Sequence, residues 1–201
     1  MTARAPLPRV HAITDERVAR REDLDRVARA LVAAGGDAIA LHARGRTLSG
    51  REHFELALRL PGRRFVNDRL DVALAAEAEG VQLGTGGLGV AAARALRPTW
   101  WIGRSVHDLA EARAAFAEAA DYLVVGPVFA TATHPGREPL GVPAFARIVE
   151  VGLPAIAIGG VTRLRAAELR GAGAYGVAAI SALWDAREPG QAVRELLEVF
   201  V

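Results

Sequence analysis

The sequence contains neither cysteine nor lysine. All 25 of its basic side chains are arginine, against 23 acidic ones, in a chain of 201 residues. Without cysteine there is no disulfide and no thiolate nucleophile. Without lysine there is no Schiff-base lysine and no P-loop lysine. These absences exclude covalent catalysis through a thiol or a lysine amine, and the P-loop type of nucleotide binding.

Long apolar runs are also missing. No stretch reaches the ~18 residues that a membrane helix needs, and the first ten residues lack the apolar core of a signal peptide. The arginines are dispersed and the formal net charge is only +2, which does not indicate a basic surface for nucleic acid. With 51% hydrophobic residues the composition is globular. We expect a cytoplasmic protein that binds neither a membrane nor nucleic acid.

Short apolar runs alternate with longer helical patterns along the whole chain. The predicted strands are 10–13, 37–43, 64–66, 81–83, 100–103, 122–128, 155–158 and 175–180. The predicted helices between and after them are 22–34, 49–60, 69–78, 90–96, 109–119, 142–151, 164–172 and 191–200. Several strand patterns are apolar throughout, which is typical of parallel strands buried on both faces. Eight strand–helix units without a linker predict an α/β chain, a small single-domain (β/α)8 TIM barrel over residues 1–201. An open, doubly wound sheet is the alternative.

In such a barrel the active site lies where the strands end. Gly159 and Gly160 follow the seventh strand, and Ile180 and Ser181 follow the eighth. Glycine exposes backbone N–H groups, and barrels commonly bind a phosphate at these two loops. We therefore expect a phosphate there, the alternative being simple turns.

Polar side chains follow other strands. Asn67 and Asp68 end the third strand, where an amide beside a carboxylate suits a ligand or a hydrated magnesium ion. Their alternative role is to cap the next helix. The connection 130–140 is the most polar one and carries Thr131, Thr133 and His134. Histidine titrates near neutral pH and suits acid–base chemistry.

The other histidines fall into three groups. His42 and His107 lie near the predicted barrel mouth, together with Arg44 and Ser105. His11 lies inside a strand, where a hydrogen-bonded core histidine is expected. His53 falls in a helix and is expected at the surface. The spacings do not match a zinc motif such as HExxH.

Seven strand-end segments together resemble the thiamin phosphate synthase/TenI family. They are His11–Asp15 (HAITD), Val66–Asp68 (VND), Gly80–Gly84 (GVQLG), Ile102–His107 (IGRSVH), Asp121–Phe129 (DYLVVGPVF), Ala157–Gly160 (AIGG) and Gly176–Ser181 (GVAAIS). The resemblance covers nearly the whole chain and implies a (β/α)8 barrel. It also implies one of two chemistries. The synthase joins an aminopyrimidine diphosphate to a thiazole phosphate with Mg2+, whereas TenI-like tautomerases aromatise a carboxythiazole phosphate without a cofactor.

The chain departs from both patterns. Ala40, His42 and Arg44 stand where the synthase has Gln, Arg and Lys, and His134 stands where it has a lysine. Gly87 stands where the synthase has an acidic residue that helps to hold Mg2+. Pro127 stands where the tautomerase has its catalytic histidine, and proline cannot transfer protons. HAITD and IGRSVH look closer to TenI.

The resemblance therefore favours a thiazole tautomerase, an isomerase acting on a phosphorylated thiazole. His134 would be its acid/base, with His107 and His42 as the next candidates. The expected substrate-binding residues are Arg44, Asn67, Asp68, Ser105, Thr131 and Thr133. One alternative is a thiamin phosphate synthase, a transferase in which Asp68 alone holds Mg2+ and Arg44 holds the diphosphate. Another is a non-catalytic relative that binds the ligand. Three tryptophans, Trp100, Trp101 and Trp184, are candidates either for a homo-oligomer interface or for the core.

Overall fold

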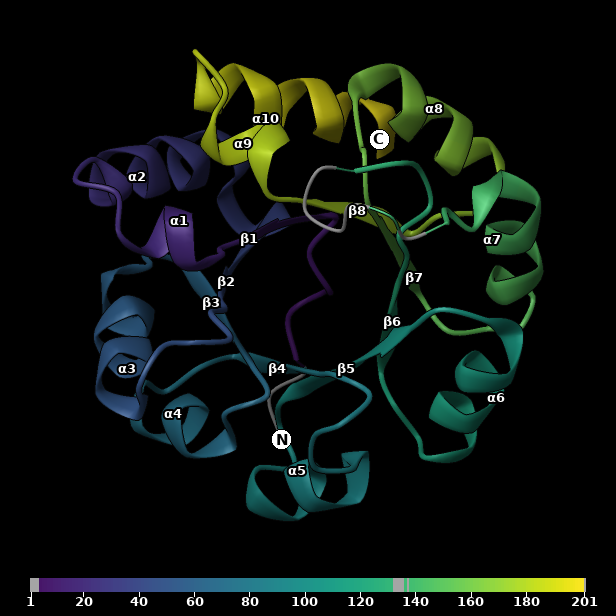
Figure 1. Cartoon of the computed structure of the whole chain (residues 1–201), viewed down its shortest axis with the longest axis horizontal. Helices are drawn as coiled ribbons and strands as arrows, with labels where there is room; N and C mark the ends of the chain where they lie inside the picture. The colour runs from purple at the N-terminus through teal and green to yellow at the C-terminus, as the bar shows by residue number, and fades with distance from the viewer. Residues whose placement is uncertain (1–3, 132–135, 137, 201) are drawn as a thin grey trace.

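A closed barrel of eight parallel strands is surrounded by helices (Figure 1). The computed structural model describes residues 4–131, 136 and 138–200. Neighbouring strands pair in chain order, and β1 pairs with β8, which closes the ring. The predicted (β/α)8 barrel is confirmed, and closure excludes the open doubly wound sheet. Within the described residues, none of the helices is long and apolar enough to cross a membrane.

Eight strand–helix units follow one another around the barrel. The strands are β1 (Val10–Ile13), β2 (Ile39–Ala43), β3 (Arg63–Asn67), β4 (Gly80–Leu83), β5 (Trp101–Val106), β6 (Tyr122–Val125), β7 (Ala155–Ile158) and β8 (Gly176–Ala179). The α-helices are α1 (Glu16–Ala19), α2 (Leu24–Gly35), α3 (Gly50–Arg59), α4 (Leu70–Ala75), α5 (Val90–Leu96), α6 (Leu109–Ala117), α7 (Gly141–Val149), α8 (Arg163–Gly171), α9 (Ser181–Trp184) and α10 (Pro189–Leu197). Two 3-10 turns, Gly36–Ala38 and Glu198–Phe200, complete the described elements.

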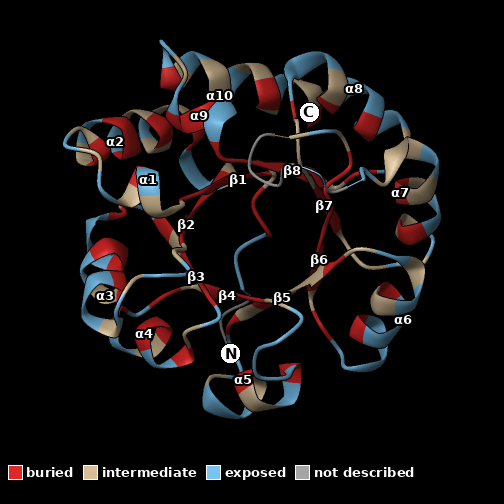
Figure 2. Cartoon of the chain, viewed as in Figure 1, coloured by how far each residue is buried: buried red, intermediate tan, exposed pale blue. Residues whose placement is uncertain are grey.

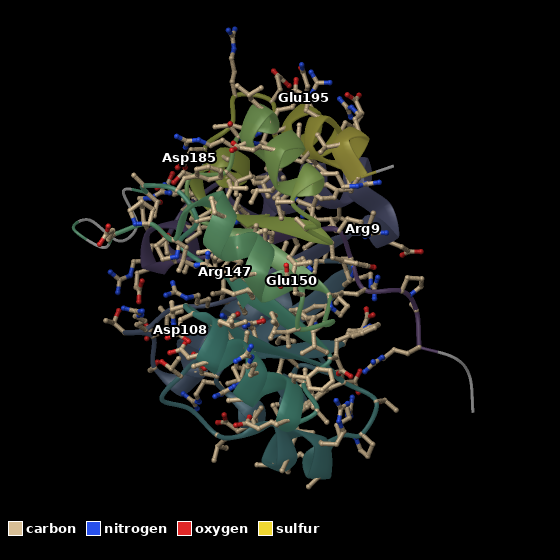
Figure 3. The ribbon with its side chains drawn as sticks, turned by 90° about the vertical axis from the view of Figure 1, so that its right-hand side faces the viewer. Arg9, Asp108, Arg147, Glu150, Asp185 and Glu195 are labelled. Carbon is tan, nitrogen blue, oxygen red and sulfur yellow. The ribbon has the colours of Figure 1, made fainter. Side chains whose placement is uncertain are left out.

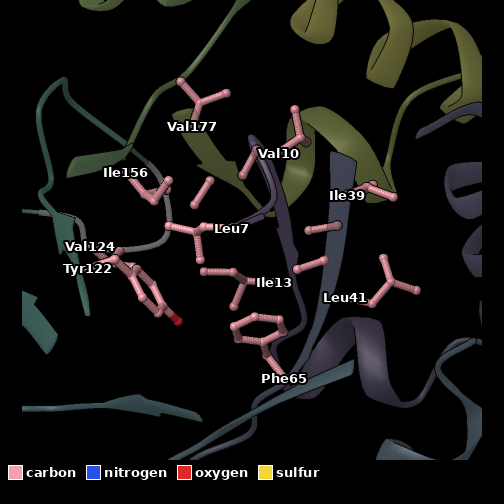
Figure 4. Packing of buried hydrophobic residues seen from close by; sticks show 14 of the residues in the cluster. Leu7, Val10, Ile13, Ile39, Leu41, Phe65, Tyr122, Val124, Ile156 and Val177 are labelled. Carbon is pink, nitrogen blue, oxygen red and sulfur yellow. The ribbon is translucent and has the colours of Figure 1, made fainter. Parts of the chain in front are cut away.

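Large and small residues alternate inside the barrel. The strands are buried along almost their whole length (Figure 2). Phe65 and Tyr122 fill the interior from β3 and β6 (Figure 4). Gly80 pairs with Phe65 across the sheet and Gly103 pairs with Tyr122, and a side chain on either glycine would overlap the paired ring. The glycines thus make room for the two rings, which is how a barrel interior becomes a packed core.

The helices cover the barrel with one apolar face each. α3 begins with a capping box, in which Ser49 and Glu52 satisfy each other's backbone N–H groups. His53 on α3 was expected at the surface, and this expectation is wrong. Its ring is buried against β2 and its Nε2–H donates to the Ala43 carbonyl at 2.9 Å. Of the two places expected for the tryptophans, an oligomer interface or the core, Trp100 and Trp184 occupy the core, where both are fully buried.

The segment before β1, residues 4–9, crosses the barrel at the end where the strands begin (Figure 1). Its buried Leu7 points into the interior (Figure 4). Three sides of the barrel hold it: Asp121 accepts from the Arg4 guanidinium at 3.1 Å, Arg63 donates to the Pro6 carbonyl at 2.6 Å, and the Tyr175 hydroxyl donates to the Leu7 carbonyl at 2.7 Å. The segment therefore covers this end of the barrel and leaves the opposite end for ligands.

Candidate active site

A cavity of about 580 Å³ opens at the end of the barrel where the strands finish. In Figure 3, Asp108 and Asp185 mark this end and Arg9 marks the opposite one. The volume suits a small substrate, because ligand pockets commonly measure roughly 300–1,000 Å³. Most of the residues predicted from the strand ends meet here: Arg44, Asn67, Asp68, Ser105, His107, Thr131, Gly159, Gly160, Ile180 and Ser181.

His42 is the predicted residue that the structure describes but does not place in the cavity lining. It is fully buried behind the cavity, with its ring stacked on Phe65. Burial lowers the pKa of His42 to about 4, so this ring is neutral at physiological pH. His134 and Thr133 lie outside the described residues. The predicted acid/base role of His134 stays a prediction.

The end of β3 presents a carboxylate in a fixed orientation. Asp68 has a positive φ of 61°, and its Oδ1 accepts a hydrogen bond from the Gly84 N–H at 2.6 Å. The following helix α4 is capped at Arg69 without a side-chain hydrogen bond, so Asp68 serves the cavity rather than the helix. A non-glycine residue in the left-handed region carries a conformational cost and is often found at functional sites.

Arg44 brings a positive charge to the same cavity. Its backbone N–H donates to the Thr14 hydroxyl at 2.8 Å, which fixes the chain as it leaves β2. Burial and then the nearby Arg46 lower the pKa of Arg44, while Glu16, Asp68 and Asp15 act in the opposite direction. Among the described residues its guanidinium has no hydrogen-bond or ion-pair partner, so it is available to an anion.

His107 is a histidine of the cavity wall that can take part in proton transfer. It lies just beyond β5 and is partly buried. Its Nδ1–H donates to Oε2 of Glu111 at 2.9 Å. This hydrogen bond fixes the tautomer and leaves Nε2 as the nitrogen that can accept a proton.

Sequence reasoning missed Gln82. It lies one residue before the end of β4, lines the cavity, and donates from Nε2 to the Ser105 hydroxyl at 2.9 Å. Its Oε1 and the Tyr122 hydroxyl are buried without a partner among the described residues. The signal was the inward position of Gln82 in an otherwise apolar strand, which is where a barrel places its lining residues.

The opposite wall of the cavity exposes backbone at two adjacent glycines. Gly159 and Gly160 have φ values of 101° and 63°, which favour glycine. A β-carbon on Gly159 would stand 2.7 Å from Cα of Pro127, and one on Gly160 would stand 2.6 Å from the Ala130 carbonyl oxygen. These glycines and the first turn of α9 face the same space. This is the arrangement expected of the predicted phosphate site.

Magnesium is the cation that the resemblance associates with a synthase. The described residues contain no group of three or more His, Cys, Asp and Glu side chains placed to hold a metal. Mg2+, however, is usually bound through one or two carboxylates together with substrate phosphates and water. Asp68, which lines the cavity opposite the glycine wall, fits this requirement.

Comparisons with known proteins agree with this geometry. A thiamine-phosphate synthase of Chloroflexus aurantiacus is 39% identical over 94% of this chain and 90% of its own length. One of Pyrococcus furiosus is 37% identical over 95% and 94%. The family model described as thiamine monophosphate synthase (TMP-TENI) matches residues 10–183. The chain belongs to the TMP-TENI family. A solved structure described as thiamine phosphate pyrophosphorylase from Pyrococcus furiosus superposes on it with a TM-score of 0.81, at 33% identity over 96% of this chain and 95% of that one.

The family predicted from the strand-end segments is therefore confirmed. The closer resemblance to TenI is not supported, because these TMP-TENI relatives carry the name of the synthase. The findings favour the alternative activity over the one that the sequence motifs ranked first.

Proposed function

We propose that this protein is a thiamin phosphate synthase, a transferase that joins an aminopyrimidine diphosphate to a thiazole phosphate and releases pyrophosphate. The observation that carries the proposal is the combination, in one cavity, of an Arg44 guanidinium that has no partner among the described residues and an oriented Asp68 carboxylate. A cation and a magnesium ligand are what a departing diphosphate requires. The names of the TMP-TENI relatives support the same activity.

Each wall of the cavity has a role in this proposal. The glycine wall, Gly159 and Gly160, binds the phosphate of the thiazole through backbone N–H groups. Arg44 binds the diphosphate, and its forked guanidinium can form two parallel hydrogen bonds to it. Asp68 would hold Mg2+, and the bound ion would supply positive charge for the leaving pyrophosphate. A single carboxylate suffices because the diphosphate supplies further oxygen ligands.

A paired activity assay tests the proposal. One reaction contains aminopyrimidine diphosphate, thiazole phosphate and Mg2+, and thiamin phosphate is measured. The other contains only carboxythiazole phosphate, and its ultraviolet absorbance is followed. We expect coupling in the first reaction. Isomerisation without coupling would establish the tautomerase instead, and no activity in either would leave a ligand-binding relative.

The tautomerase is the second candidate because His107 meets the cavity with a defined tautomer. An imidazole held by a carboxylate is suited to moving a proton on a ring substrate. Under this candidate, His107→Gln abolishes isomerisation while ligand binding remains. Unchanged isomerisation in His107→Gln would remove His107 from that role.

A further inference from the structure

A row of hydrogen bonds runs through the barrel interior behind the cavity. The Pro8 carbonyl lies 3.1 Å from Nε2 of His11, and Nδ1 of His11 lies 2.8 Å from Nε2 of His42. Nδ1 of His42 lies 3.1 Å from Oδ1 of Asn67. Both rings are fully buried, and β1, β2 and β3 carry the three side chains in turn. We refer to Pro8, His11, His42 and Asn67 as the histidine row.

Both imidazoles of the row are neutral. Burial lowers the pKa of His11 well below its usual value, and the neighbouring His42 lowers it further. Burial is also the main cause that lowers the pKa of His42 to about 4. Phe65 and Tyr122 surround the two rings, and the nearby Arg63 also disfavours a positive charge on His11. A neutral imidazole has one N–H and one acceptor nitrogen.

Counting protons along the row fixes the direction of every hydrogen bond. The Pro8 carbonyl can only accept, so the proton of His11 is on Nε2. Nδ1 of His11 then accepts, and the proton of His42 is on its Nε2. Nδ1 of His42 is left as an acceptor, so Asn67 must donate to it. The amide nitrogen of Asn67 therefore faces His42.

Asn67 can donate to Nδ1 of His42 if its side-chain amide group is rotated by a half-turn, which exchanges its oxygen and nitrogen. With its oxygen on Nδ1 of His42, two acceptors would face each other in a buried site. The two ends of an asparagine amide have the same shape, so the hydrogen-bond network decides which end lies where. The half-turn exchanges oxygen and nitrogen, leaves the neighbouring atoms in place, and satisfies all three contacts of the row.

We propose that the histidine row is a positioning device that turns the amide oxygen of Asn67 towards the cavity. Asn67 lines the cavity next to Asp68, so the end of β3 then presents two adjacent acceptors. Such a pair binds hydrogen-bond donors, either an amino group of the substrate or the water shell of a cation, and disfavours phosphate oxygens. The anionic groups are thereby directed to Arg44 and to the glycine wall. The orientation of the amide follows from the row alone, whereas its use in selecting a substrate rests on the proposed synthase function.

Histidine tautomers in the resting protein test the orientation directly. In a 15N-histidine-labelled sample near pH 7, two-bond correlations show which ring nitrogen carries the proton. We expect His11 and His42 both as Nε2–H tautomers. The same spectrum contains its own references, because His53 donates from Nε2 and His107 donates from Nδ1. An Nδ1–H tautomer of His42 would mean that the amide oxygen faces it, and would overturn the proposal.

A matched pair of variants extends the test. Asn67→Asp keeps the shape of the side chain but, as a carboxylate, can only accept, so His42 is expected to gain a proton on Nδ1 while it keeps the one on Nε2. Gln82→Glu makes the same amide-to-acid change on the cavity wall without touching the row, and leaves the protonation of His42 as in the wild type. A His42 that carries a proton on Nδ1 and none on Nε2, in the wild type and in Asn67→Asp alike, contradicts the proposal. If that variant fails to fold, the wild-type spectrum decides alone.

The selection of donors is tested on the wild-type protein by following the side-chain amide signals of Asn67. Mg2+ alone and the aminopyrimidine without its diphosphate are titrated in separate samples. A response to either one supports the acceptor pair and identifies the donor. A response to inorganic phosphate alone, or to none of the three, overturns it. The tautomers do not depend on turnover, so failure of the synthase assay and failure of this proposal are distinguishable.

Discussion

Gly87→Asp should strengthen Mg2+ binding, and the adjacent Gly86 provides a matched control. A β-carbon on Gly87 would stand 3.3 Å from Oδ1 of Asp68, whereas one on Gly86 has nothing within 4 Å. Gly87 is not in the left-handed region, so aspartate fits its backbone. Both positions are exposed. Gly87→Asp therefore places a second carboxylate beside Asp68, and Gly86→Asp adds the same charge elsewhere.

The size of the effect follows from Coulomb's law. A carboxylate and a divalent cation 4 Å apart interact by about 8 kcal/mol at an effective dielectric constant of 20, twice the value for two unit charges. Because Asp68 is exposed, screening and the repulsion between the two carboxylates reduce the net gain. We expect about 1.4 kcal/mol to remain, which is roughly tenfold tighter Mg2+ binding.

Calorimetric titration of Mg2+ in the presence of pyrophosphate measures this difference for the wild type and the two variants. Gly87→Asp should bind about tenfold more tightly, and Gly86→Asp should resemble the wild type. Equal gains in both variants would show a general effect of charge rather than pairing with Asp68. No gain in Gly87→Asp would remove Asp68 as the magnesium ligand.

Three further predictions concern the cavity and the interior. Arg44→Gln should weaken the binding of pyrophosphate by about 1.5–3 kcal/mol, the worth of a hydrogen bond to a charged group; calorimetry measures this, and unchanged affinity would exclude Arg44 as the anion site. Gly103→Ala should lower the free energy of unfolding by about 1–3 kcal/mol, because the added methyl overlaps the Tyr122 ring; urea unfolding measures this, and wild-type stability would contradict the packing argument. The lowered pKa values of His11 and His42 mean that the unfolded chain binds more protons below the usual value of 6.5. Stability should therefore fall as the pH drops from 6.5 to about 4, by roughly 1.4 kcal/mol per pH unit for each neutral ring. Urea unfolding at pH 7 and pH 5 checks the sign, and equal stability at both values would show that the rings are protonated in the native state.

The sequence predicts the barrel well because its apolar pattern reports burial directly. The run 155–158 coincides with β7, and the run 10–13 coincides with β1. The predicted and observed ends of a strand differ where backbone pairing, rather than hydropathy, extends the strand. The strand predicted at 100–103 continues in β5 through Ser105 and Val106, because β6 pairs with it over that length. The short helix α1 was not predicted, since four residues capped by Asp15 leave no periodic signal.

The site was predictable in position but not in detail. The strand-end rule brings Arg44, Asp68 and Ser105 together because parallel strands finish at one edge. It cannot show that His42 points into the barrel and contacts His11. Strand periodicity shows on which side of the sheet a side chain lies, but not which other side chain it contacts. The sequence motifs ranked the tautomerase above the synthase, whereas the names of the TMP-TENI relatives favour the synthase. The ranking differs because single positions such as Gly87 weighed more than the similarity of the whole chain.

The segment that covers the far end of the barrel has a consequence for how the protein is made. Residues 4–9 leave the ribosome before every strand, yet the Leu7 carbonyl is bound by Tyr175, 168 positions later in the chain. The Arg4 guanidinium donates to Asp121, which is made 117 positions later. Contacts of this span form late because long loops must close first. Residues 4–9 are thus translated first but are among the last to pack against the barrel. In the nascent chain, the end of the barrel where the strands begin stays uncovered until β8 has been translated.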